Sequence, residues 1–331
     1  MQIKINRKYT KILAVIVGAV LAIVLIFAVL SIWENRHDAA EAAGSDAAEE
    51  RYLYLNDVCY MPNNSLETIL MIGVDKYEGD TKESYNNNQQ ADFLMLLVLD
   101  RADRTYTGIH LNRDTVTDIP VLGVRGENAG TATGQLALAH TYGSGGKDSC
   151  RNTVEAVSNL LYGVKINHYI SFTMDAVEQI NDLVGGVTVT MPDDLSSVSP
   201  EMRKGATVTL KGEKALAYVR ARYGLEDSTN LNRMKRQRQY LKELSSQISL
   251  KHESDDSFML KALDKVSEYM VSDCTVNQLS RIYDYMDSYE DEGFRVMEGS
   301  AAEGQEFMEF YPDEDALKQL VAEIFYIRAQ E

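Results

Sequence analysis

Residues 91–114, ADFLMLLVLDRADRTYTGIHLNRD, contain the pattern that decides the class of fold. Two apolar runs, 93–99 and 105–111, are joined by the polar segment DRADR. A polar connection this short suits an antiparallel hairpin. We therefore predict two strands, with Asp92 at the beginning of the first and Arg113 and Asp114 just after the second.

A third apolar run precedes this hairpin. Residues 68–74, TILMIGV, are continuous and bounded by polar residues, which is typical of a strand buried on both faces. Asp75 follows directly. If the second hairpin strand lies beside this run and parallel to it, the two aspartates and Arg113–Asp114 meet at one edge of the sheet, where open α/β sheets usually bind ligands. Carboxylates are hard ligands that suit Mg²⁺, so Asp75 and Asp92 are our candidate metal ligands. A turn or capping role for each is the alternative.

The rest of the chain alternates between helical and strand patterns. We predict helices at 148–161, 174–183, 212–219, 258–270, 276–286 and 312–326, and strands at 169–172, 187–190, 294–297 and 307–310. This alternation indicates a layered α/β fold. We therefore predict a single α/β/α domain over residues 67–331 with a mixed central sheet.

Basic residues concentrate in one part of an acidic protein. Residues 203–238 hold ten Lys or Arg against three Asp or Glu, whereas the whole chain has a formal net charge of −17. Such a cationic region on an acidic protein indicates an anionic ligand. A solvated basic surface stripe is the alternative explanation.

The end of this basic region has the spacing of a helix. Arg233 and Gln237 are four residues apart and share one helix face, and Asn230 or Asn232 could cap that helix. Both side chains then lie near a helix N-terminus, where backbone N–H groups favour phosphate.

Arg220 and Arg222 have a different spacing. Two residues apart, they share a face on an extended segment and lie on roughly opposite sides of a helix. We therefore predict that the helix over 212–219 ends before Arg220 and that the two arginines act together.

The beginning of the chain is strongly apolar. Residues 12–33, ILAVIVGAVLAIVLIFAVLSIW, are 22 residues without a charge, enough to cross a bilayer as a helix. Basic residues precede this segment and mostly acidic ones follow it, so the positive-inside rule leaves residues 1–11 as a short cytoplasmic tail. The run exceeds the usual apolar core of a signal peptide. We expect a single-pass anchor in the cell membrane with the rest of the chain extracytoplasmic, and a cleaved export signal is the alternative.

Residues 34–66 follow the predicted anchor and begin with a segment rich in Ala and acid, so we expect a juxtamembrane stalk. The eleven residues before the anchor are too few for a helix-turn-helix. The acidic charge also disfavours nucleic acid, whose binding depends on phosphate neutralisation, so we predict no such partner. Cys59, Cys150 and Cys274 lack CxxC spacing, which argues against a metal cluster, and the sequence does not select a disulfide pair among them.

From Thr68 onward the chain resembles the LytR–CpsA–Psr family of bacterial cell-wall phosphotransferases. Six pieces carry the resemblance and occur in the family's order: ILMIGVD (69–75), ADFLMLLVLD (91–100), LNRDTVTDIP (111–120), LVGGVTVTMP (183–192), LKGEKALAYVRAR (210–222) and RMKRQRQYL (233–241).

The resemblance implies a membrane-anchored, Mg²⁺-dependent phosphotransferase. Such an enzyme moves a glycopolymer, teichoic-acid-like or capsular polysaccharide, from a polyprenyl-pyrophosphate carrier to peptidoglycan. The resemblance assigns the metal to Asp75 and Asp92. It places the pyrophosphate, which guanidinium groups bind well, on Arg113, Arg220, Arg222, Arg233 and Gln237, with Arg236 near enough to assist. From these we select Arg113, Arg220, Arg222 and Asp114 as the catalytic residues.

Asp114 has three candidate roles: to orient Arg113, to cap the following turn, or to help remove a proton. We favour the first two. The sequence does not identify the catalytic base.

Two positions depart from the family pattern. Many relatives have an arginine two residues before the second metal aspartate, where this chain has Gln90. The acid often found before the RxxRQ segment is represented here by Asn230 or Asn232.

Two rival functions remain open at this level. One is a polyprenyl-pyrophosphate hydrolase, in which water replaces the sugar acceptor. The other is a binding protein or attenuator that holds lipid-linked polymer without turnover, an alternative that Gln90 makes more credible.

Overall fold

The computed structural model describes residues 52–55, 58–75, 87–123, 125–221, 230–255, 257–304 and 307–329. The predicted tail, the membrane helix at 12–33 and Arg222 lie outside these residues. Among the described residues, no helix has the length and apolar character needed to cross a membrane. Residues from Leu53 onward form one compact unit.

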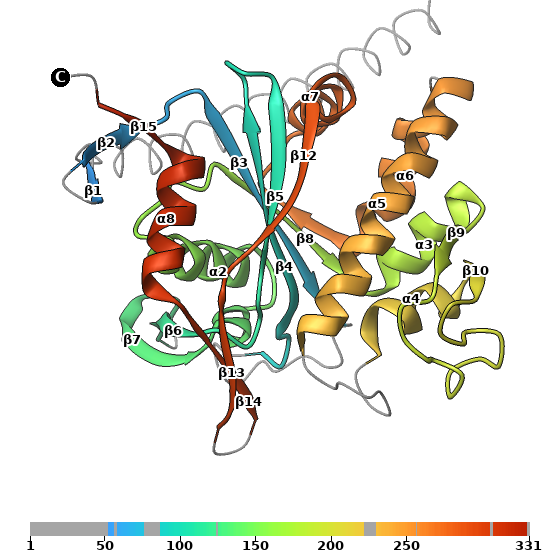
Figure 1. The fold of residues 1–331 in the computed structure, drawn as a ribbon, viewed down its shortest axis with the longest axis horizontal. Helices are drawn as coiled ribbons and strands as arrows, with labels where there is room; N and C mark the ends of the chain where they lie inside the picture. The colour runs from blue at the N-terminus through green and yellow to red at the C-terminus, as the bar shows by residue number, and fades with distance from the viewer. Residues whose placement is uncertain are drawn as a thin grey trace, which may run out of the picture. The chain divides into compact units, whose positions relative to one another are not determined.

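A six-stranded mixed sheet forms the centre of this unit (Figure 1). Its strands, in spatial order, are β11 (Met270–Ser272), β8 (His168–Thr173), β3 (Leu66–Val74), β4 (Ala91–Asp100), β5 (Thr105–Leu111) and β12 (Glu290–Val296). The β3–β8 and β5–β12 pairs are parallel, and the other neighbours are antiparallel. The predicted mixed central sheet is therefore confirmed.

One expected strand pairing was wrong. β5 does not lie beside β3, because β4 pairs with both of them. β4 is apolar along nearly its whole length, and a central position buries both of its faces. β3 and β5 still run in the same direction, so the end of β3, the beginning of β4 and the end of β5 share one edge.

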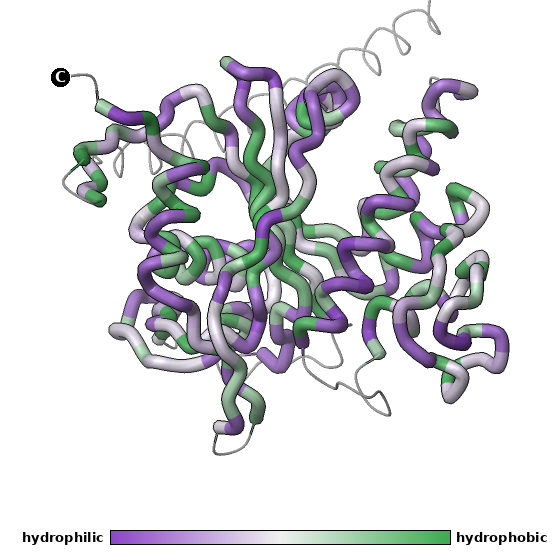
Figure 2. The backbone as a smooth tube through the Cα atoms, in the orientation of Figure 1, coloured by the Kyte–Doolittle hydropathy of each residue, from purple (hydrophilic) through white to green (hydrophobic). Residues whose placement is uncertain are grey.

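Successive side chains of these strands pack against opposite layers, as the pleat requires. Leu70 and Ile72 lie in a core shared with α2 (Lys147–Leu160) and α8 (Glu314–Phe325). Ile69 points to the other face, toward Ile282 of α7 (Val276–Ser288). Figure 2 shows hydrophobic residues concentrated along the central strands. Helices thus cover both faces, as an α/β/α arrangement demands.

A second core lies beside the sheet and fixes the helices that carry the basic region. It is built from Val187, Leu210, Tyr218 and Tyr240, among others. Gly185 ends the helix Asp175–Val184. Its φ of +91° is a left-handed conformation, which glycine adopts without a Cβ clash. The elements are α3 (Asp175–Val184), β9 (Val187–Thr190), β10 (Thr207–Leu210), α4 (Glu213–Arg220), α5 (Asn230–Ser254) and α6 (Phe258–Val266).

Smaller elements surround the two cores. They are β1 (Leu53–Leu55), β2 (Val58–Pro62), β6 (Val116–Leu122), β7 (Asn128–Gln135), the 3₁₀ helix η1 (Leu136–Thr141), the 3₁₀ helix η2 (Ser267–Tyr269), β13 (Gly299–Glu303), β14 (Met308–Pro312) and β15 (Tyr326–Arg328). Asp313 caps α8 by accepting a hydrogen bond from the backbone N–H of Ala316. α2 begins at Lys147, one residue before the predicted start, and the hydroxyl of Ser149 donates to the carbonyl of Tyr142.

Candidate functional site

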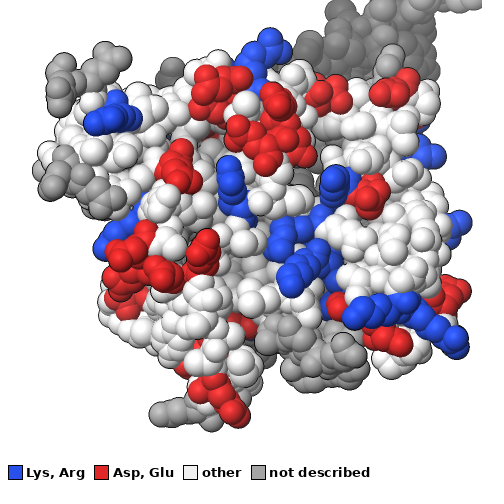
Figure 3. Space-filling view, in the orientation of Figure 1, with Lys and Arg blue, Asp and Glu red and all other residues white. Residues whose placement is uncertain are grey.

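Five chain segments meet at the shared edge of the sheet. Asp75 follows β3, Asp92 lies near the start of β4, and Arg113 and Asp114 follow β5. The end of α4 and the first turns of α5 approach from the second core. In Figure 3, many of the basic side chains visible on this face gather around α5.

Arg113 is buried and engaged by neighbours from three directions. Its Nη1 contacts the Asp92 carboxylate, and its Nη2 donates to Oε1 of Gln90. Its Nε lies 3.2 Å from Oδ1 of Asp114. The structure thus supports an orienting role for Asp114, and Gln90, which replaces a family arginine, is a hydrogen-bond partner of Arg113.

Asp92 is shared by a second guanidinium. Arg233 Nη1 lies 3.7 Å from Oδ1 of Asp92, and Arg233 Nη2 donates to the Asp92 carbonyl at 3.2 Å. The side chains of Arg113 and Arg233 are only 9% and 6% exposed, so water screens these charges weakly. Asp92 therefore holds together Arg113 and Arg233, which are 120 positions apart in the chain.

Asp75 has a different environment. Its Oδ1 lies 2.9 Å from Nη2 of Arg220, but this ion pair lacks hydrogen-bond geometry, and that oxygen is buried without a hydrogen-bond partner. Burial and the nearby charge of Asp92 raise the pKa of Asp75, against the opposing effect of Arg220. Two carboxylates that disfavour each other's charge, one with an unsatisfied oxygen, suit a bound cation. The residues present therefore fit a magnesium ion held by Asp75 and Asp92.

Arg220 is the last residue of α4, and Ala221 is extended (φ −53°, ψ 129°). The prediction that Arg220 and Arg222 share an extended segment is therefore wrong for Arg220. Arg222 lies outside the described residues. Arg220 still reaches the edge of the sheet, because the helix end directs its side chain to Asp75.

Gln237 connects the two helices of the basic region. Its Nε2 donates to the carbonyl of Val219 at 3.1 Å, while its Oε1 is buried without a hydrogen-bond partner. Gln237 thus supports the end of α4, one residue before Arg220, and keeps one acceptor oxygen available.

Arg236 does not reach this group. Its side chain is fully buried and donates to the carbonyls of Tyr218 and Ala221 and to Asp193. The expectation that Arg236 assists in pyrophosphate binding conflicts with this position. Its guanidinium is occupied in holding the α4 C-terminus against α5, because helix-end carbonyls need donors.

Two asparagines that the sequence analysis did not assign to the site connect two of its chain segments. Asn230 Nδ2 donates to Oδ1 of Asn112, which also accepts from the backbone N–H of Asp114. Asn230 lies within α5, so its side chain joins α5 to the end of β5. In the sequence, Asn230 was a candidate helix cap, whereas Asn112 was marked only by its position between a strand end and Arg113.

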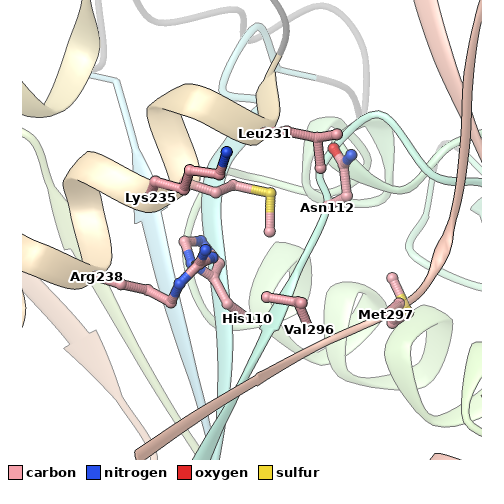
Figure 4. A pocket seen from close by; sticks show the side chains of 8 residues that line it. His110, Asn112, Leu231, Lys235, Arg238, Val296 and Met297 are labelled. Carbon is pink, nitrogen blue, oxygen red and sulfur yellow. The ribbon is translucent and has the colours of Figure 1, made fainter. Parts of the chain in front are cut away.

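A small pocket of 140 Å³ is lined in part by Asn112 (Figure 4). Burial and the charge of Arg238 lower the pKa of His110 well below its ordinary value, so His110 is neutral, and its Nδ1 faces Arg238 Nη1 at 3.3 Å. Lys235 also lines the pocket. The lining is His110, Asn112, Leu231, Met234, Lys235, Arg238, Val296 and Met297.

The LytR_cpsA_psr family model matches residues 27–323. The chain belongs to the LytR–CpsA–Psr family. The edge of the sheet that carries Asp75, Asp92 and Arg113 lies within the matched region.

Two curated relatives of this family member are transferases by name. The polyisoprenyl-teichoic acid–peptidoglycan teichoic acid transferase TagU of Enterococcus faecalis is 28% identical over 67% of this chain and 66% of its own length. TagV of Bacillus subtilis, which has the same transferase name, is 29% identical over 65% of this chain and 52% of its own length. The chain thus matches between half and two thirds of these relatives.

Solved structures show the same LytR–CpsA–Psr fold. A Streptococcus agalactiae protein superposes with a TM-score of 0.63 at 22% identity, covering 78% of this chain and 86% of its own. The arrangement of the sheet and its helices is therefore shared even where the sequences have diverged.

Proposed function

We propose that this chain is a membrane-anchored, Mg²⁺-dependent phosphotransferase that moves a glycopolymer from a polyprenyl-pyrophosphate carrier to peptidoglycan. The observation that carries the proposal is the interleaving of Asp75 and Asp92 with three guanidinium groups at one edge of the sheet. The transferase names of the relatives support the substrate classes. The apolar segment 12–33 supports the anchor.

The charges of the site suit a metal–pyrophosphate ligand. Three carboxylates, Asp75, Asp92 and Asp114, face three arginines, Arg113, Arg220 and Arg233. Without a ligand, each guanidinium is paired with a carboxylate. A magnesium ion bound by Asp75 and Asp92 would supply positive charge against the pyrophosphate and its leaving group.

The chain's own residues would then act on the phosphates. With the carboxylates engaged by the cation, Arg113, Arg220 and Arg233 can turn their donors toward phosphoryl oxygens, which planar guanidinium groups bind bidentately. Asp114 keeps Arg113 oriented while this happens. Gln237 positions the end of α4 and thereby Arg220.

In the proposed reaction, an acceptor sugar hydroxyl forms a bond to the phosphorus that carries the glycopolymer. The bond from that phosphorus to the oxygen bridging the carrier phosphate breaks, polyprenyl phosphate leaves, and the hydroxyl loses its proton. Positioning and charge neutralisation supply most of the catalysis in phosphoryl transfer. The mostly apolar pocket beside Asn112 offers a surface for the first part of an apolar carrier.

One experiment tests this function. The full-length chain in detergent is incubated with Mg²⁺, a lipid-pyrophosphate saccharide and peptidoglycan fragments, and the products are analysed by mass spectrometry. A saccharide joined to peptidoglycan through a phosphodiester, lost on chelation of the metal, is the expected product. Free saccharide phosphate alone would show a hydrolase, and binding without any product would show a non-catalytic receptor.

A further inference from the structure

A second group of potential metal ligands lies at the opposite end of the sheet. His168 begins β8, where it is level with Ile69 of β3, whereas Asp75 follows the end of β3. Asp273 and Cys274 follow β11, the strand that pairs with β8. One potential ligand atom from each of His168, Asp273 and Cys274 lies within 4.8 Å of the others.

We propose that His168, Asp273 and Cys274 bind a divalent transition-metal ion of the zinc type. An imidazole nitrogen, a carboxylate oxygen and a cysteine sulfur together suit zinc and not magnesium, which takes oxygen ligands. This site is separate from the proposed phosphotransfer site. A bound ion would link His168, at the start of β8, to Asp273 and Cys274, which follow β11.

The distances are close to those of a tetrahedral site. Nδ1 of His168 lies 3.5 Å from Oδ1 of Asp273, and Sγ of Cys274 lies 3.9 Å from the same oxygen. Zinc bonds of about 2.0–2.3 Å place neighbouring tetrahedral ligands roughly 3.3–3.6 Å apart. The two distances to Asp273 are thus within a few tenths of an ångström of that spacing. The carboxyl side chain is 35% exposed, so water can reach a fourth position.

The ligand segment is already held in place without a metal. The backbone N–H of Tyr169 donates to Oδ1 of Asp273 at 3.0 Å. Ser272 Oγ accepts from the N–H of Cys274 and donates to the carbonyl of Tyr169. Thr275 then caps α7 with a capping box. A preorganised segment loses little conformational freedom when it binds an ion.

Gln278 opposes metal binding in the native chain. Its Nε2 lies 3.2 Å from Nε2 of His168, and its Oε1 is held by the N–H and hydroxyl of Thr275. A metal on Nδ1 leaves the proton on Nε2, facing an amide group that can only donate. Glutamate at position 278 can keep the capping box with one oxygen and accept the Nε2 proton with the other. Gln278→Glu should therefore tighten the site.

The test uses the full-length chain in detergent, without lipid substrate. Zn²⁺ is titrated by calorimetry, and Co²⁺ is followed through the absorption of its bond to thiolate. We expect one thiolate-bound ion per chain, at least tenfold weaker binding at this site in His168→Ala and Cys274→Ser, and roughly tenfold tighter binding in Gln278→Glu. Cys59→Ser should keep the cobalt–thiolate band and the zinc affinity of the native chain.

The gain-of-affinity variant separates metal binding from simple loss of structure, because a misfolded protein does not bind more tightly. Melting temperatures measured without metal identify any variant that fails to fold. Absence of the cobalt–thiolate band, native affinity in Cys274→Ser, or no tightening in Gln278→Glu would each overturn the site.

Discussion

The carboxylates of Asp75 and Asp92 lie near enough for the charge of Asp92 to raise the pKa of Asp75. The two aspartates are 17 positions apart in sequence and come from different strands. Their carboxylates differ in ion pairing, because Asp92 pairs with two buried arginines whereas, among the described residues, Asp75 pairs with the half-exposed Arg220 alone. Because of this difference, asparagine at position 75 and asparagine at position 92 should change the stability of the protein in opposite directions.

Asp75→Asn should stabilise the metal-free protein while abolishing Mg²⁺-dependent transfer. Because the folded protein raises the pKa of Asp75 above 3.8, the folded state binds more protons there, and stability falls as the pH rises through that range. The side chain is 44% exposed, so the gain at neutral pH should be under about 1 kcal/mol. Urea unfolding at neutral pH and below pH 3.8 measures the gain in the free energy of unfolding of the variant. A gain that persists in full at the lower pH contradicts this explanation.

Asp92→Asn should abolish transfer and also destabilise the protein. Removing this carboxylate leaves Arg113 and Arg233 buried without their shared anion, and hydrogen bonds to charged groups contribute about 1.5–3 kcal/mol each. Urea unfolding without Mg²⁺, compared directly with Asp75→Asn, gives the difference. Equal stability of the two variants would show that Asp92 is not the structural centre of the site.

Alanine variants of Arg220 and Arg236 should separate an effect on ligand binding from an effect on the stability of the fold. Arg220→Ala should weaken pyrophosphate-lipid binding by roughly 10- to 150-fold with a stability change below about 1 kcal/mol, because Arg220 is 48% exposed. Arg236→Ala should cost about 3–5 kcal/mol of stability, because it removes the buried cation between α4 and α5. Binding isotherms and unfolding curves measure the two effects.

The control for these variants is Lys251→Ala, in the last turn of α5 and exposed. We expect it to keep both affinity and stability. Arg222→Ala and Arg233→Ala should weaken binding like Arg220→Ala, and lysine at position 220 should restore it only partly because it lacks the planar fork. Loss of binding in Lys251→Ala would indicate a general electrostatic surface.

Gln90→Arg should lower the stability of the ligand-free protein and raise its affinity for pyrophosphate. Gln90 Oε1 accepts from Arg113, so an arginine there places two like charges together in the ligand-free protein. We expect a lower melting temperature without ligand and tighter binding of a pyrophosphate analogue, which would separate the two cations. Unchanged affinity would mean that position 90 does not face the phosphates.

Membrane orientation can be checked in intact spheroplasts. The basic residues before segment 12–33 predict that external protease digests the domain after Trp33. Disruption of the membrane provides the control for protease access to residues 1–11. Protection of the domain in intact spheroplasts would reverse the proposed topology.

The positions of several strands were predictable because local patterns decide them, whereas β6, β7 and β10 were not predicted. The run at 105–111 matches β5, and the run at 187–190 matches β9. Apolar continuity signals a buried strand whatever its neighbours are. Pairing order was not predictable, since the same runs are compatible with β5 beside β3 or with β4 between them.

The chain's own sequence determined the most apolar strands, the basic region and the aspartates at strand ends, because hydrophobic periodicity and residue chemistry are local properties. Only the tertiary structure decided which cations face the site. Arg233 and Arg236 are three residues apart on one helix, yet Arg233 reaches Asp92 while Arg236 is enclosed between α4 and α5. The proximity of His168 to Cys274 likewise depends on β11 pairing with β8. Contacts between distant segments depend on how the layers pack, and no local pattern in the chain contains that information.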